Sequence, residues 1–181
     1  RRGHHVFDKT SSQQIVMVNP NRDVLFKLRS AETSFKCPML MVEGYDPLNS
    51  NGLVFYNERI SDIERIKPDA FDGVDLYLLD FKDATIDLRE NAMVVLGAIR
   101  FIKTLYPTDV FMEGMSVLGF SMGGEIARYA LAYAEHNNIP HYCSQLISYD
   151  SPHRGAVINT VLQKRVQKLY NDLCTTSDVA Q

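Results

Sequence analysis

The sequence predicts an α/β protein built on a mostly parallel β-sheet with helices on both faces. Short apolar runs typical of buried strands alternate with segments of helical periodicity, which is the pattern of a parallel sheet. A serine between two glycines, Gly119-Phe120-Ser121-Met122-Gly123, stands where one such strand meets a helix. Loops rich in polar residues follow the strands, and in a parallel sheet such loops meet at one edge. These loops are 44–47, 80–83, the turn at Ser121 and 150–155.

The N-terminal third of the chain predicts a β-hairpin at an edge of the sheet, then a buried strand and a short helix. Turn-forming residues at 19–23 separate the two strands of the hairpin. The next run is apolar at every position, as in a strand buried on both faces. A weak helical pattern then ends before Pro68. The expected strands are 14–18, 24–28 and 39–42, and the expected helix is 60–66.

The rest of the chain alternates regularly between strands and helices. The clearest helix has apolar residues three or four positions apart and ends before Pro107. The helix after the serine ends near Asn138 and Pro140. The expected strands are 74–79, 116–118 and 145–149, and the expected helices are 88–102, the segment from the serine to residue 137, and 157–173.

Composition excludes several classes of function. The 181 residues are 45% hydrophobic and 23% charged, and the net charge of −3 indicates neither nucleic acid nor an anionic membrane surface as a partner. The sequence contains no apolar run of the ~20 residues that a transmembrane helix needs. We expect a polar tail over 1–13 and one domain over 14–181. The scattered cysteines Cys37, Cys143 and Cys174 predict neither a disulfide scaffold nor a metal site.

The serine motif points to one kind of chemistry. A Gly-x-Ser-x-Gly turn between a strand and a helix is called a nucleophile elbow, in which a strained turn at positive φ exposes the serine hydroxyl. Gly119 and Gly123 avoid Cβ clashes in that turn, and the turn aims the first N–H groups of the helix at a developing negative charge. Alternatively, the glycines only let the strand pack on the helix, and Ser121 caps the helix.

Three segments that follow expected strands have distinctive sequences. They are Val42-Glu43-Gly44-Tyr45-Asp46-Pro47, Leu118-Gly119-Phe120-Ser121-Met122-Gly123-Gly124 and Asp150-Ser151-Pro152-His153-Arg154-Gly155. On these segments the chain resembles the α/β-hydrolase superfamily, and more narrowly the lipase and esterase branch that includes PGAP1-like hydrolases. It is also similar to uncharacterised secreted Bacteroidetes proteins, and this similarity favours a secreted or periplasmic location.

The resemblance implies a serine esterase or lipase that works through an acyl-enzyme, with Ser121 as the nucleophile. The N–H of Met122 would be one donor to the oxyanion. The second donor would come from the loop after strand 39–42, where lipases often carry His-Gly. Glu43-Gly44 stands in that place, which makes the Tyr45 N–H the expected second donor. The expected substrate is a small-molecule or lipid ester, with neither a metal nor an organic cofactor.

A nucleophilic serine needs a histidine base and an acid, which follow it in this superfamily in the order acid, then histidine. Asp150 is the candidate acid, or else a loop-capping aspartate. His153 is the candidate base, or else a structural residue of the loop, because only three positions separate it from Asp150. His136 and His141 flank a break at the other end of the sheet. The last strands of the fold are missing, so we expect the true histidine beyond Gln181.

Other interpretations stay open at this point. Without an evident base, the chain could be a catalytically silent binding module with the same fold. An acyl-enzyme could also pass its acyl group to an alcohol or amine, as in an acyltransferase, and the same fold also supports peptidases.

Charged residues close to the candidate site also have alternative roles. Asp80 and Asp83 either line a pocket or cap the helix that follows them. Glu43 either touches the substrate or pairs with Arg128 or Arg154.

Overall fold

The computed structural model describes residues 13–16, 23–29, 37–46, 52–106, 114–157 and 159–177 of the chain. The expected tail up to residue 12 and most of the hairpin turn lie outside these ranges. The chain forms two compact units, Arg1–Ser151 and Pro152–Gln181. None of the helices within the described ranges combines the length and apolar character that a membrane span requires.

The first unit is built on a six-stranded sheet. Its strands are β1 (Gln13–Val16), β2 (Val24–Arg29), β3 (Cys37–Val42), β4 (Val74–Asp80), β5 (Met115–Phe120) and β6 (Cys143–Tyr149). In the order β1-β2-β4-β3-β5-β6, the last four strands are parallel, and β2 pairs antiparallel with both β1 and β4. The predicted parallel sheet with an N-terminal hairpin at its edge is therefore confirmed.

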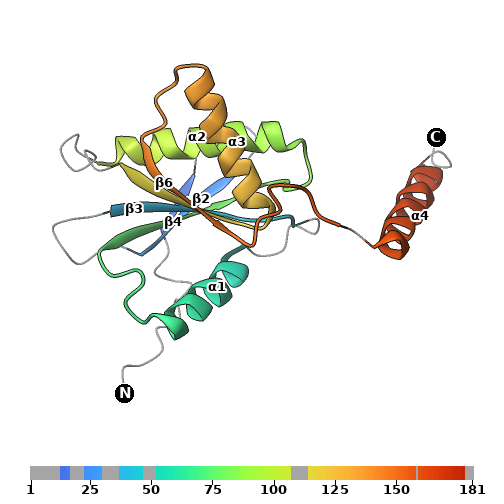
Figure 1. The fold of residues 1–181 in the computed structure, drawn as a ribbon, viewed down its shortest axis with the longest axis horizontal. Helices are drawn as coiled ribbons and strands as arrows, with labels where there is room; N and C mark the ends of the chain where they lie inside the picture. The colour runs from blue at the N-terminus through green and yellow to red at the C-terminus, as the bar shows by residue number, and fades with distance from the viewer. Residues whose placement is uncertain are drawn as a thin grey trace. The chain divides into compact units, whose positions relative to one another are not determined.

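Helices cover both faces of this sheet, as the sequence predicts (Figure 1). The helices of the first unit are α1 (Gly52–Ile66), α2 (Leu88–Thr104) and α3 (Met122–His136). One apolar cluster packs α1 against one face, and a larger one packs α2 and α3 against the other. Residues at the centre of the larger cluster include Leu40, Val42, Val95, Ile99, Val117 and Ala130.

Helix α1 begins at Gly52, well before the expected start at residue 60. Tyr56 and Ile60 lie one helical turn apart and are both fully buried against the sheet, so the apolar stripe extends further towards the N-terminus than expected. The Tyr56 hydroxyl also donates to the Leu79 carbonyl oxygen at 3.2 Å. This bond ties the first half of α1 to β4.

Helix α2 is capped by a residue that the sequence analysis did not choose. Asp87 is the N-cap, and its side chain accepts a hydrogen bond from the Arg89 N–H at 2.9 Å. The expectation that Asp80 or Asp83 caps this helix is wrong. Asp83 instead accepts from the Thr85 N–H at 2.8 Å, which closes a turn in the loop before the helix.

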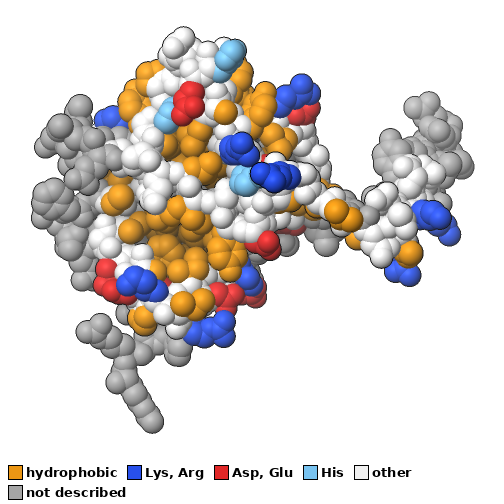
Figure 2. Space-filling model, in the orientation of Figure 1, with side chains coloured by type: hydrophobic (Ala, Val, Ile, Leu, Met, Phe, Trp, Pro, Cys, Tyr) orange, Lys and Arg blue, Asp and Glu red, His pale blue; other side chains and the backbone are white. Residues whose placement is uncertain are grey.

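Apolar side chains gather on the sheet face between α1 and β6 (Figure 2). Met39, Ile63 and Ile147 are partly buried there against the α1 cluster. β6 is the last strand of the described sheet, and its side chains are exposed or half-buried. β5 lies between β3 and β6, so the residue that follows β5 is flanked by a strand end on each side.

The second unit contains the helix α4 (Thr160–Ser177). The Asn159 side chain accepts from the Val161 N–H at 2.8 Å, as an N-cap residue does. This cap explains why the helix begins at Thr160 and not at residue 157, where its apolar pattern starts.

Candidate active site

The turn between β5 and α3, residues 119–124, is called the Ser121 turn below. Ser121 has φ 49° and ψ −123°, so the expected positive φ is confirmed. Such a conformation is strained for a residue with a side chain, and it lifts the side chain away from the strand. Ser121 is exposed, and its side chain makes no capping hydrogen bond to α3. The alternative role of Ser121 as a helix cap is therefore not supported.

Glycines let the Ser121 turn pack within itself and against the ends of two neighbouring strands, β3 and β6. A Cβ on Gly119 would overlap with the backbone of Gly124 in the same turn. A Cβ on Gly123 would overlap with the carbonyl oxygen of Glu43, which directly follows β3, and a Cβ on Gly124 would overlap with the Ser151 hydroxyl, beyond the end of β6. The glycines of the turn are therefore in direct contact with their neighbours, and these contacts fix the position of the Ser121 backbone.

The end of β6 lies directly beside Ser121. Phe120 pairs with Tyr149 in the parallel register, and the Ser121 N–H donates to the Tyr149 carbonyl oxygen at 2.9 Å. Asp150 follows Tyr149, is exposed and has φ 50°. Asp150 and Ser121 therefore each follow one residue of a pair on adjacent strands. Adjacent strands of a sheet are about 4.8 Å apart. The role of Asp150 as the acid stays a prediction.

The loop after β3, residues 43–46, lies on the other side of Ser121 and is called the 43–46 loop below. A Cβ built on Gly44 would be 3.1 Å from both the Ser121 Cβ and the Phe120 carbonyl oxygen. The loop backbone thus passes close to the serine, and the next residue, Tyr45, is 60% exposed. Across the turn, Met122 begins α3, where a backbone N–H has no acceptor within its own helix.

Glu43 is not placed to touch a substrate and does not pair with Arg128, whereas its pairing with Arg154 of the second unit stays a prediction. Its side chain is only 3% exposed, which is too buried to touch a substrate. Oε1 accepts from the Phe81 N–H at 2.6 Å, and the carboxyl group also shares a hydrogen bond with Asp80, not with Arg128. Burial, together with the nearby charge of Asp80, raises the pKa of Glu43 to about 8.

Asp80 lies at the end of β4, beside Glu43. The residues before them, Val42 and Leu79, are paired in the parallel register of β3 and β4. Burial raises the pKa of Asp80 to about 6, with a further contribution from the charge of Asp46. At neutral pH the protonated Glu43 therefore donates to the ionised Asp80.

Two of the histidines considered as bases lie away from Ser121. His136 is the last residue of α3, a helix of 15 residues that begins next to Ser121 and is on the order of 20 Å long. His141 precedes β6, at the opposite end of the sheet from Ser121, and its Nδ1 accepts from the Cys143 N–H at 3.1 Å. His153 belongs to the second unit, and its role as base or loop residue stays a prediction.

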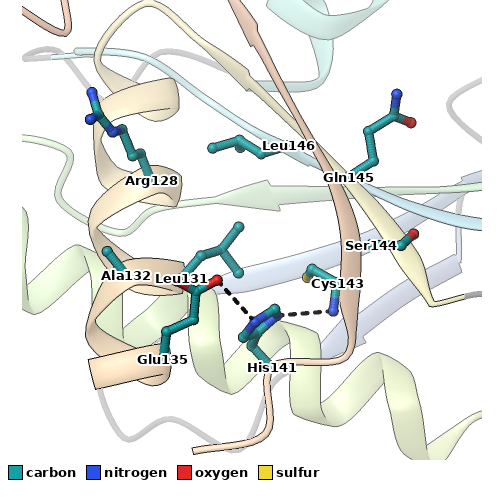
Figure 3. Close-up of a pocket in the computed structure, with 9 residues that line it drawn as sticks. All are labelled: Arg128, Leu131, Ala132, Glu135, His141, Cys143, Ser144, Gln145 and Leu146. Carbon is teal, nitrogen blue, oxygen red and sulfur yellow. Dashed lines mark hydrogen bonds and ion pairs between the residues drawn. The ribbon is translucent and has the colours of Figure 1, made fainter. Parts of the chain in front are cut away.

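His141 also borders a groove of about 320 Å³ between α3 and the first half of β6 (Figure 3). His141 Nε2 lies 3.6 Å from Glu135 Oε1 across this groove. The remainder of the groove is lined by residues of α3 and of the first half of β6: Arg128, Leu131, Ala132, Cys143, Ser144, Gln145 and Leu146. The groove thus runs along α3 towards the His141 end of the sheet. Within the described ranges, no three His, Cys, Asp or Glu side chains come together as metal ligands would.

Comparison with known proteins adds a family and a fold. The model of a family described as a PGAP1-like alpha/beta domain matches residues 75–180, which is more than half of the chain. No curated protein sequence matches the chain.

Solved structures with the same fold include lipases and esterases. The mature form of the Bacillus licheniformis lipase BlEst2 is 21% identical with a TM-score of 0.53, over 76% of this chain and 49% of that one. Thermogutta terrifontis esterase 2 is 13% identical with a TM-score of 0.53, over 83% of this chain and 61% of that one. The chain covers 27% of the propeptide form of BlEst2 and 49% of the mature form. These likenesses show the α/β-hydrolase fold of the chain.

Proposed function

The chain belongs to the PGAP1-like α/β domain family, and from this premise we propose that it is a serine hydrolase of the esterase or lipase type. In this proposal Ser121 is the nucleophile, and the substrate is a small-molecule or lipid ester. The resemblance to secreted Bacteroidetes proteins leads us to propose a secreted or periplasmic location as well.

One observation carries the proposal: Ser121 is exposed at positive φ, and its hydroxyl is not used to cap α3. A serine that only terminated a strand or capped a helix would not need this strained conformation. The strain is maintained by glycine contacts to the ends of β3 and β6, which is typical of a side chain held for function.

The proposed reaction is an acyl transfer through this serine. The Ser121 Oγ attacks the ester carbonyl carbon, and its proton passes to a histidine base. The N–H groups of Met122 and Tyr45 stabilise the oxyanion. The alcohol leaves with that proton, and water then releases the acid from the acyl-enzyme. Asp150 is our candidate for the acid that orients the base, and His153 is the candidate base within this chain.

Aromatic side chains beside the site support an apolar substrate. Tyr45 is 60% exposed and Tyr149 is 49% exposed. Tyr45 lies in the loop after β3 and Tyr149 is the last residue of β6, and these two strands flank Ser121. The Tyr149 ring also lies 5.6 Å from the Phe120 ring, so part of this surface is continuous with the core. We expect the acyl group of the ester to lie against these rings.

The proposal is tested by labelling with a fluorophosphonate probe and mapping the labelled peptide. Wild-type protein should be labelled at Ser121, and Ser121→Ala should lose the label completely. Ser144→Ala is the matched control, because Ser144 is exposed at the opposite end of β6 and should not affect labelling. Labelling of Ser121→Ala at the wild-type rate would contradict the proposed nucleophile.

A silent binding module is the second candidate, because both described histidines of the first unit lie away from Ser121. This candidate predicts that wild-type protein is not labelled at all, either as this chain or in any longer form. An acyltransferase would be labelled like an esterase. Analysis of the products in the presence of a competing alcohol or amine separates those two activities.

A further inference from the structure

The ends of β3 and β4 are joined through one buried side chain next to the candidate active site. Glu43 follows β3, and its carboxyl group reaches the backbone and the side chain of residues at the end of β4. We propose that Glu43 is a positioning residue, whose hydrogen bonds to the Phe81 N–H and to Asp80 hold the 43–46 loop in place for oxyanion binding beside Ser121. This inference rests on the proposed function, because it assumes that the Tyr45 N–H binds the oxyanion.

The anchoring of the loop begins at the Glu43 side chain. Its Oε1 lies 2.6 Å from the Phe81 backbone nitrogen, and the Phe81 side chain is itself buried in the core. The second contact is with the side chain of Asp80, the last residue of β4 and the residue directly before Phe81. A loop with no regular secondary structure is thereby attached to the sheet through the first of its residues.

The loop transmits this position to the Ser121 turn through backbone contacts. Gly123 packs against the Glu43 carbonyl oxygen, closely enough that a Cβ would not fit between them. Gly44 faces the Ser121 Cβ and the Phe120 carbonyl oxygen. Because there is no spare room on either side, a shift of the Glu43 backbone moves the Tyr45 N–H relative to the serine.

The titratable groups that surround Glu43 in the described part of the chain are acids. Asp80 of β4, Asp46 of the same loop and Tyr56 of α1 face it, and Asp23, the residue before β2, faces Asp80. Burial among them raises the pKa of Glu43 to about 8, so the group is protonated at neutral pH and donates to Asp80.

Ionisation of Glu43 would remove this hydrogen bond and place a second negative charge beside Asp80. The same charge lies within the loop that binds the negatively charged oxyanion. Acylation of Ser121 should therefore become slower above about pH 8, and Glu43 should be the cause.

Three variants separate positioning from general stability. Glu43→Gln keeps an uncharged side chain of the same shape, which can accept from the Phe81 N–H and donate to Asp80. Glu43→Ala removes both bonds. Asp75→Asn is the matched control, because it changes a fully buried carboxyl group at the opposite end of β4. The rate of fluorophosphonate labelling at Ser121 is measured for each variant from pH 6 to pH 10.

The inference predicts a different result for each variant. Wild-type protein should show an alkaline decline with a midpoint near pH 8, and Glu43→Gln should label at a similar rate at pH 7 but lose this decline. Glu43→Ala should label about 10-fold to 100-fold more slowly at pH 7, approaching the effect of a lost oxyanion donor. Asp75→Asn should keep the wild-type pH profile. An unchanged alkaline decline in Glu43→Gln would overturn the inference.

A second measurement does not depend on catalysis, so that failure of this inference can be told from failure of the proposed function. Carbon-detected NMR follows the backbone carbonyl carbons of Gly44 and Tyr45 across the same pH range. In wild-type protein both should titrate with a midpoint near pH 8, and in Glu43→Gln neither should. Titration without any labelling would reject the hydrolase and keep Glu43 as the group that sets the loop. Labelling without titration would reject the positioning role alone.

Discussion

The glycines of the Ser121 turn differ from the glycine in helix α2 in what surrounds them. Gly123 faces carbonyl oxygens at the end of β3, and a Cβ there would lie 2.5 Å from the Val42 oxygen. Gly97 lies in the interior of α2 on its exposed side, with nothing within 4 Å of a Cβ. The same substitution should therefore have opposite effects at the two positions.

We expect Gly123→Ala to destabilise the protein by about 3 kcal/mol, because backbone atoms must move to admit the methyl group. Gly97→Ala should stabilise it by up to about 1 kcal/mol, since alanine is the better helix former and meets no obstacle. Urea unfolding of both variants measures these differences. Equal stabilities of the two variants would show that the turn is less closely packed than described.

A buried hydrogen-bond chain at the start of β4 gives a second prediction about single residues. The Tyr106 hydroxyl donates to Asp75 Oδ2 at 2.5 Å and lies 2.7 Å from the Tyr77 hydroxyl. Tyr106→Phe removes a donor from a fully buried carboxyl group, which should cost about 1–3 kcal/mol of unfolding free energy. Tyr129→Phe, on the exposed side of α3, should stay within about 0.5 kcal/mol of wild type.

At the scale of single elements, the start of α2 depends on Asp87. Its side chain accepts from the Arg89 N–H, and the contact with the Arg89 side chain lowers the pKa of Asp87 to about 2. Because the pKa is lowered in the folded state, this contribution is present above about pH 4 and is lost as the pH falls towards 2. Asp87→Ala should speed hydrogen exchange of the Arg89 amide at neutral pH, whereas Glu90→Ala should leave it protected by the cap.

Most elements could be predicted from periodicity, and the exceptions have local causes. The strand expected at 74–79 is Val74–Asp80, because alternating and continuous apolar runs mark buried strands directly. The first half of α1 was missed because a loop-like segment precedes it, and because Tyr56 contributes to the core only once the sheet is in place. The cap of α2 was misplaced because several aspartates in one loop have the same propensity to cap.

The candidate site could be predicted only where its residues are neighbours in the sequence. Ser121 and its glycines form one short motif, so the motif alone predicts the turn and its positive φ. The bond between Glu43 and Asp80 depends on β3 and β4 being adjacent, which is a property of strand order. The only signal in the sequence was that both residues directly follow strands, and this signal predicts a shared edge but not a contact.

At the scale of the whole molecule, two buried carboxyl groups make stability depend on pH. Burial raises the pKa of Asp80 to about 6 and that of Glu43 to about 8, both above the values of the unfolded chain. For each group, between its pKa in the unfolded chain and its higher pKa in the folded protein, the folded state holds a proton that the unfolded state has released. The free energy of unfolding therefore falls as the pH rises through this range.

We therefore expect the unfolding free energy to fall by on the order of 2 to 5 kcal/mol between pH 5 and pH 8.5. Glu43→Gln should lose most of this decline above pH 6, because it removes the group with the higher pKa. Urea unfolding at the two pH values measures the effect. A decline of the same size in wild type and Glu43→Gln would assign the pH dependence to other groups.

The close packing of the Ser121 turn has a practical consequence for anyone who prepares this protein. The turn forms only when the ends of β3 and β6 are both in place, because its glycines touch each of them. A chain with a mispaired or frayed strand cannot present the serine in its reactive geometry. If the serine is reactive, burst titration with a stoichiometric probe counts correctly folded molecules in a preparation, and the labelled fraction becomes an assay of sample quality that needs no substrate.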